Sequence, residues 1–236
     1  YFVMEYIQGA PLNQYCDENK LGLKERLDLF IQVCGGVHHA HQKGVIHRDL
    51  KPGNILVTEV EGKPVPKIID FGVAKATSQH LTVQTLFTQM GQMIGTPEYM
   101  SPEQADLTAE DIDIRSDVYS LGVLLYELLT GVLPLERREI MRAGLEKMAL
   151  HVQNEVPKKP STRIDTEIRQ SEGTTRLHVS DTRTWIRRIR GDLDWITMKA
   201  LEKDRDRRYG SAADLAADIV RHNESQVVTA GPPSRA

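Results

Sequence analysis

The hydrophobic positions of the chain change their spacing several times, and the first long regular stretch has the period of a helix. Between residues 21 and 43, apolar side chains recur every three or four positions, and Gly44 follows as a helix stop. These positions are Leu23, Leu27, Phe30, Ile31, Cys34 and Val37. The pattern predicts a long amphipathic helix over residues 21–43.

A second helix is predicted over residues 117–131, where the sequence reads DVYSLGVLLYELLTG. Ser116 is a suitable N-cap for it, and Gly131 is a suitable C-terminal stop. Because the segment is apolar on almost every side, it belongs in the middle of a helical layer. We expect it to be the central, buried helix of the domain.

Short β-prone runs lie before and between these two helices. Residues 2–7 predict one strand, which stops at the Gly-Ala-Pro linker at 9–11. Residues 45–46, 55–57 and 67–69 predict three more, and a turn with Gly and Pro joins the last two into a hairpin. Polar segments separate these runs, and the candidate catalytic residues lie in those segments.

Two polar stretches have weak periodicity. Residues 73–95, rich in Thr, Gln and Ser, predict a long loop. Residues 132–190 carry 13 Lys and Arg against 8 Asp and Glu, and the sequence PKKPSTR at 157–163 predicts a loop there. We interpret this charge as solvated surface, with docking of acidic substrates or nucleic acid as the alternative.

Regular structure returns near the C-terminus. Residues 191–204, GDLDWITMKALEKD, predict a helix, and Ser211 with Asp214 resembles a capping box before a further one. Residues 224–236 predict a linker or tail, and the start YFVMEY suggests that the sequence is a piece of a longer protein.

The composition narrows the class of protein but does not identify a binding partner. The 236 residues include 40% hydrophobic and 27% charged residues, with a net charge of −3, which is ordinary for a globular protein. Cys16 and Cys34 have no metal-type spacing and indicate reduced thiols in a cytoplasmic protein. The longest apolar stretch, 118–129, is too short for a membrane span.

Three polar motifs carry the chemistry. The first is His47-Arg48-Asp49-Leu50-Lys51-Pro52-Gly53-Asn54, which fits the catalytic-loop pattern H-R-D-L-x-x-x-N. The second, Asp70-Phe71-Gly72, begins 21 residues after Asp49. The third, at 95–103, reads GTPEYMSPE and has Ser101 at a position where Ala is usual.

With these motifs, the chain resembles the eukaryotic-like serine/threonine protein kinases over residues 1–223. Its C-terminal sequence is similar to the sequences of their bacterial branch. The resemblance implies a mainly α, α+β fold: a kinase C-lobe, with helices around a buried central helix and short β-hairpins at the active site. It also implies ATP and Mg²⁺ as cofactors and proteins with Ser or Thr acceptors as substrates. No nucleic-acid partner is expected.

The resemblance assigns roles to single residues of the site. Asp49 corresponds to the catalytic base, and Lys51 to a cation beside the transferred phosphoryl group. Asn54 and Asp70 offer the hard oxygen ligands that Mg²⁺ prefers. Thr96 corresponds to the residue that hydrogen-bonds near the base in serine/threonine-specific members.

The nucleotide base would bind at a hinge formed by Met4-Glu5-Tyr6-Ile7. In the family, backbone groups at Glu5 and Ile7 pair with adenine, and Met4 is the gatekeeper. Leu56 would form the apolar floor under adenine. An apolar column would continue from it through Leu12, Leu124 and Leu128, although ordinary core packing predicts the same leucines.

Other residues are expected to support the site. Asp117 would brace the backbone at His47-Arg48, and Glu103 would form a bidentate pair with Arg208. Arg48 suggests regulation by a phosphate in residues 73–95. Gln92 stands where many kinases have that phosphoacceptor, so Thr85 and Thr88 are alternative candidates.

His38, His39 and His41 share one predicted helix, and we expect them to have no carboxylate partner. A metal site needs more ligands than these three histidines provide. We therefore expect a packed or solvated helix face and no zinc.

No glycine-rich phosphate loop and no strand lysine precede the hinge in this sequence. The expectation is a C-terminal lobe with its hinge, which has negligible activity alone. A catalytically silent kinase-like scaffold is the main alternative function. A small-molecule phosphotransferase is a third hypothesis, against which residues 96–103 argue.

Overall fold

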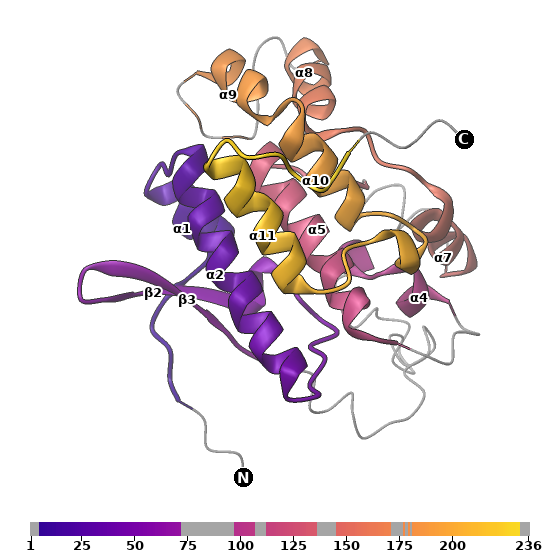
Figure 1. Cartoon of the computed structure of the whole chain (residues 1–236), viewed down its shortest axis with the longest axis horizontal. Helices are drawn as coiled ribbons and strands as arrows, with labels where there is room; N and C mark the ends of the chain where they lie inside the picture. The colour runs from indigo at the N-terminus through magenta and orange to yellow at the C-terminus, as the bar shows by residue number, and fades with distance from the viewer. Residues whose placement is uncertain are drawn as a thin grey trace.

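The computed structural model describes residues 5–71, 97–106, 112–135, 145–170, 177, 179 and 181–231. Their centre is α5 (Ile114–Thr130), which is buried on nearly all sides by neighbouring helices. α2 (Leu23–Gln42), α10 (Asp192–Ala200) and α11 (Ala212–Asn223) pack beside it (Figure 1). The predicted mainly helical α+β fold around a buried central helix is confirmed.

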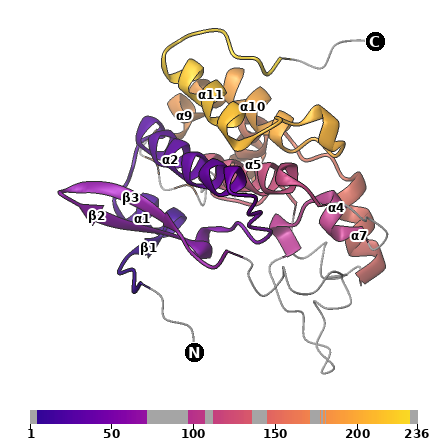
Figure 2. The same cartoon turned by 60° about the horizontal axis from the view of Figure 1, so that its bottom comes forward.

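A small antiparallel sheet lies against α2 on one side of the molecule (Figure 2). It has the order β1-β2-β3, with β1 at Ala10–Pro11, β2 at Ile55–Val60 and β3 at Lys63–Ile68. Glu61 and Gly62 form the hairpin turn, and both have positive φ angles, as the twist of a tight hairpin requires. α1 (Leu12–Glu18) follows β1 directly.

Two further pairs of helices in the described ranges lie at the ends of this bundle. α4 (Pro102–Ala105) and α7 (Leu145–Asn154) pack together, whereas α8 (Pro160–Gln170) and α9 (Thr182–Ile189) pack together at another end of the bundle (Figure 1). Among the described residues, short 3₁₀ helices span Pro52–Asn54, Pro97–Tyr99 and Arg205–Arg207. No helix in the described ranges has the length and apolar character needed to cross a membrane.

The larger hydrophobic cluster of the core confirms several predicted positions. Leu12, Leu124 and Leu128 are buried in one cluster with the apolar face of α2. Cys16 and Cys34 are buried, unpaired thiols in the same cluster. Packing of this kind provides most of the stability of such helices, because isolated helices are marginal in water.

Helix ends agree with the predictions in part. Gly131 ends α5 with a φ of 73°, and the Ser211 hydroxyl accepts a hydrogen bond from the Asp214 N–H at the start of α11. Ser116, however, is not the N-cap of α5. The helix begins one turn earlier because the Asp113 carboxylate caps it by accepting from the Arg115 N–H.

Three predictions of local structure were wrong. Of the strand predicted at residues 2–7, residues 2–4 lie outside the described part of the chain and residues 5–7 are not in a strand. The strand forms instead at Ala10–Pro11, where β2 offers a partner. Residues 45–46 are also not a strand. Part of the segment expected as a loop at 157–163 is helix α8, which Pro160 starts because proline suits the first helical position. Residues 73–95 lie outside the described part of the chain.

Candidate active site

The β2–β3 hairpin brings together the two motifs that contain Asn54 and Asp70. Ile55 pairs with Ile68, so the next pair along the hairpin is Asn54 and Ile69. The Ile69 N–H donates to the Asn54 carbonyl at 2.9 Å, which extends the ladder by that step. Asp70 therefore follows directly from the partner of Asn54, at the same end of the sheet.

Asp49, Lys51 and Asn54 are in direct contact. Lys51 Nζ lies 3.0 Å from Asp49 Oδ2. The Asn54 amide nitrogen donates to the Asp49 backbone carbonyl at 2.8 Å and to Oδ2 at 3.1 Å. Since the Asp49 side chain is 27% exposed, it is fixed by its neighbours and still accessible from solvent.

The backbone just before Asp49 is held by Asp117, as the sequence predicts. Asp117 is fully buried in the first turn of α5, and its two carboxylate oxygens accept the N–H groups of His47 and Arg48, each at 2.8 Å. Arg48 has a φ of 66°, a left-handed conformation that is costly for a residue with a side chain. The Asp117 brace therefore holds a strained residue next to Asp49.

The prediction that the histidines of α2 have no carboxylate partner was wrong for His41. Its Nε2 lies 2.8 Å from Asp117 Oδ2, and its side chain is only 3% exposed. The partner was missed because it lies 76 positions further along the chain. Among the described residues, no group of three or more His, Cys, Asp or Glu side chains could hold a metal ion.

Gln104 is a further site residue that the sequence reasoning missed. Its Nε2 donates to the Arg48 carbonyl at 2.9 Å, so both backbone polar groups of Arg48 are bonded. Gln104 also accepts from the Ser101 N–H, which completes a capping box at the start of α4. The sequence S-P-E-Q at 101–104 has the capping-box pattern, which could have identified Gln104.

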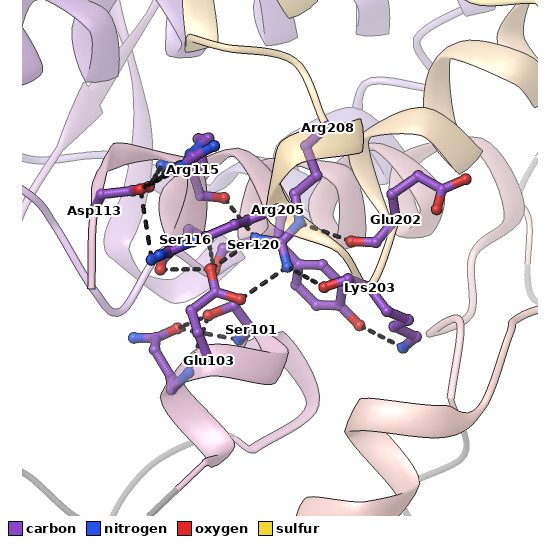
Figure 3. A network of polar contacts seen from close by, with 12 residues as sticks. Ser101, Glu103, Asp113, Arg115, Ser116, Ser120, Glu202, Lys203, Arg205 and Arg208 are labelled. Carbon is purple, nitrogen blue, oxygen red and sulfur yellow. Dashed lines mark hydrogen bonds and ion pairs between the residues drawn. The ribbon is translucent and has the colours of Figure 1, made fainter. Parts of the chain in front are cut away.

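Glu103 and Arg208 form the predicted bidentate pair, with distances of 2.7 and 2.8 Å (Figure 3). Ser116 donates a third hydrogen bond to Glu103 at 2.7 Å. Burial alone would raise the pKa of Glu103, but the hydrogen bonds from Arg208 and Ser116 outweigh it and lower that pKa. The network fixes α4 against α5 and the segment that follows α10.

The donor set at the sheet end fits a magnesium ion that is shared with phosphates. Because the Asn54 nitrogen is bonded to Asp49, its amide oxygen is the atom left to act as a ligand. Asp70 is exposed and adds a carboxylate. Mg²⁺ typically takes only one or two protein oxygens together with substrate phosphates and water, so a pair of this kind is sufficient.

The other predicted site residues are placed as follows. Met4 and Thr96 lie outside the described residues. Glu5 and Ile7 are in irregular backbone ahead of β1, and Glu5 is exposed. Leu56 lies on β2, opposite Pro11, and is half-buried. The structure thus brings together Asp49, Lys51, Asn54 and Asp70, and leaves the hinge roles as predictions.

Bacterial kinases are among the known proteins with similar sequences. The chain is 35% identical over 227 residues to the serine/threonine-protein kinase PknB of Mycobacterium leprae, which covers 96% of this chain and 31% of that protein. It is 35% identical over 231 residues to the probable serine/threonine-protein kinase SCO3848 of Streptomyces coelicolor, covering 98% and 29%. The chain therefore spans less than a third of the length of these curated relatives.

Solved structures show the same fold. The crystal structure of the PknI kinase domain from Mycobacterium tuberculosis superimposes with a TM-score of 0.59 at 23% identity, over 93% of this chain and 64% of that one. The sequence pattern of the protein kinase domain matches residues 1–223. The chain therefore belongs to the protein kinase domain family.

Proposed function

We propose that this chain is part of a kinase that transfers the γ-phosphoryl group of ATP to serine or threonine hydroxyls of proteins. One observation carries the proposal: Asp49 is hydrogen-bonded to both Lys51 and Asn54 in a loop whose strained backbone is braced by Asp117. The names of the bacterial relatives support the same reaction.

Each side chain has a task that its geometry suits. Asp49 accepts a hydrogen bond from the substrate hydroxyl and takes its proton as the new P–O bond forms and the bond from the γ-phosphorus to the bridging oxygen breaks, which releases ADP. Asn54 holds the Asp49 carboxylate in position through its amide nitrogen. Lys51 places a positive charge within 3.0 Å of the base, where it stabilises negative charge on the transferred group.

Asn54 and Asp70 would hold magnesium through the Asn54 amide oxygen and the Asp70 carboxylate. When bound, Mg²⁺ would neutralise charge on the nucleotide phosphates. The contribution of the chain is to keep the two ligands at one end of the hairpin, and the bond from the Ile69 N–H to the Asn54 carbonyl does so.

The nucleotide base would lie between the hinge and the sheet. Met4, Glu5 and Ile7 supply the hinge in this proposal, and Leu56 supplies the apolar floor. Thr96 would hydrogen-bond near Asp49 and favour Ser or Thr over Tyr as the acceptor. A scaffold without catalysis would have no need of a carboxylate held by both a lysine and an amide, so the arrangement around Asp49 favours an enzyme.

The proposal is tested with the protein as its gene encodes it, incubated with [γ-³²P]ATP, Mg²⁺ and a generic acceptor protein. We expect labelled phosphoserine or phosphothreonine. Asp70→Asn should lower the rate by about a hundredfold or more, because a magnesium ligand is weakened. Asp206→Asn, at a side chain that is 77% exposed, is the control and should leave the rate unchanged.

Two results would overturn the proposal. Label found only on small alcohols would indicate a small-molecule phosphotransferase. A folded protein that transfers no label to any acceptor would indicate a silent scaffold.

A further inference from the structure

The arginines at α9 differ from those of the neighbouring helix α8. In α8, Arg163 pairs with Glu167 at 3.1 Å and Arg169 pairs with Asp165 at 2.9 Å. Arg183, Arg187, Arg188 and Arg190 are all exposed, and none of them forms an ion pair with a residue that the structure describes. The acidic residue in this stretch, Asp181, serves as the N-cap by accepting from the Thr184 N–H.

The helix that carries these arginines is firmly anchored. Trp185, Ile186 and Ile189 are buried in the core, and the Trp185 ring nitrogen donates to the Leu129 carbonyl at 2.8 Å. The Arg26 guanidinium lies 5.8 Å from the centre of the Trp185 ring. The exposed arginines therefore project from a fixed support, which lowers the entropy cost of ordering them around a ligand.

Three of the arginines form a stripe. Arg183 and Arg187 are one turn apart in α9, and Arg190 is its C-cap residue three positions further on, so the three follow one flank of the helix and its C-terminal end at intervals of about 5–6 Å. Alternate residues of an extended peptide lie about 6.6 Å apart on one face. A peptide with acidic side chains at alternate positions therefore matches the spacing of the stripe.

The surroundings argue against two other anionic partners. A membrane-surface helix needs a free apolar face, and the apolar face of α9 is buried. Binding of single-stranded nucleic acid usually needs exposed aromatic rings for stacking, and Trp185, the aromatic residue of this helix, is 6% exposed. Arginine forks suit carboxylates, which they bind in a bidentate manner.

We propose that Arg183, Arg187 and Arg190 form a docking site for an acidic peptide segment, rich in Asp and Glu, of a partner protein. The site is remote from Asp49. Arg26, which contacts Trp185, is near the start of α2, whereas His41 is near its end, about 22 Å further along the helix. Binding of the peptide does not depend on the proposed function. Only the further step of identifying the partner protein as a kinase substrate rests on it.

The test measures binding of a fluorescein-labelled peptide with Glu at alternate positions, by fluorescence polarisation, to the full 236-residue chain at low salt. The triple variant Arg183→Gln, Arg187→Gln and Arg190→Gln should bind it at least about threefold more weakly. The matched control, Arg163→Gln with Arg169→Gln, should bind it as the unchanged chain does. Added salt should weaken binding to the unchanged chain.

Circular dichroism should give the same melting temperature for the triple variant and the unchanged chain, because all three arginines are exposed. Asp49→Asn should bind the peptide normally, so that a failure of the catalytic proposal does not affect this readout. Equal binding by the triple variant and the unchanged chain, or no binding at all, would overturn the docking site. Tighter binding of an oligonucleotide or of anionic vesicles than of the peptide would overturn the assigned partner.

Discussion

Asp117 and Asp218 are two fully buried carboxylates on neighbouring helices, and each accepts the N–H groups of two consecutive loop residues. Asp117 on α5 binds His47 and Arg48. Asp218 on α11 binds Thr229 and Ala230, at 2.8 and 2.9 Å. The same arrangement therefore holds two segments of the chain, one at the start of the His47–Asn54 motif and one near the C-terminus.

The two carboxylates differ in what surrounds them. Asp117 has a buried imidazole beside it, His41, and the loop that it holds includes the strained residue next to Asp49. Asp218 accepts from Tyr209, Thr229 and Arg221 as well, and its loop carries no residue of the site. Loss of Asp117 should therefore affect chemistry and stability together, whereas loss of Asp218 should affect stability alone.

The largest expected effect is that of Asp117→Asn. The amide can accept from only one of the two N–H groups and turns a donor toward the other, so we expect a loss of about 3–5 kcal/mol in the free energy of unfolding. Phosphoryl transfer should fall as well, because Arg48 is released. Urea unfolding and the labelled-ATP assay measure the two effects.

Asp206→Asn is the control for this substitution because that side chain is 77% exposed. A variant at Asp117 with unchanged stability and activity would show that the brace at His47 and Arg48 is dispensable.

Asp218→Asn comes next, with an expected loss of roughly 2–4 kcal/mol. Burial would raise the pKa of Asp218, but hydrogen bonds from Thr229, Tyr209 and Ala230 outweigh it and lower that pKa to about 2. The carboxylate therefore adds stability above its ordinary pKa of 3.8, and this stability is lost as the pH falls from about 4 to about 2.

Acid unfolding followed by circular dichroism checks the sign of this effect. The unchanged chain should lose stability between pH 4 and 2 more steeply than Asp218→Asn. Parallel curves would contradict the lowered pKa. A large loss of phosphoryl transfer under conditions where Asp218→Asn is folded would contradict the separation of the two carboxylates.

The smallest expected effect is that of His41→Gln. Glutamine can still donate to Asp117 but fills the buried space less well, so a loss of about 1 kcal/mol is expected in urea unfolding. His39→Gln, at an exposed position of the same helix, should cause almost no change. Equal effects of the two substitutions would mean that the contact between His41 and Asp117 contributes nothing.

Sequence reasoning could predict the fold where side-chain periodicity determines it. The apolar spacing of α2 and the apolar character of α5 are local signals, and both helices lie close to their expected bounds. The strand at Ala10–Pro11 could not be predicted in this way, because it depends on pairing with β2, more than 40 residues later. The cap of α5 was misplaced because Asp113 and Ser116 are both good caps.

The residues of the candidate site also divide into those with a signal in the sequence and those without one. Asp49, Asn54 and Asp70 follow from motif spacing, and the Asp117 and Glu103–Arg208 contacts follow from the family resemblance. The contacts of His41 and Gln104 join residues more than 50 positions apart and have no local signature of their partners. Asp218 was missed for another reason: its loop partners lie in a segment that resembles a linker in composition.

The central claim is that Asp49, held by Lys51 and Asn54, is the base of a phosphoryl transfer. Its most direct test is the rate of transfer from ATP to a protein acceptor, at saturating ATP and Mg²⁺, in the protein as its gene encodes it. Asp49→Asn should lower that rate by about 10²–10⁴-fold with an unchanged urea midpoint, while Asp218→Asn, at a temperature where it is folded, should keep the rate. A rate for Asp49→Asn within a few-fold of the unchanged protein would contradict the account.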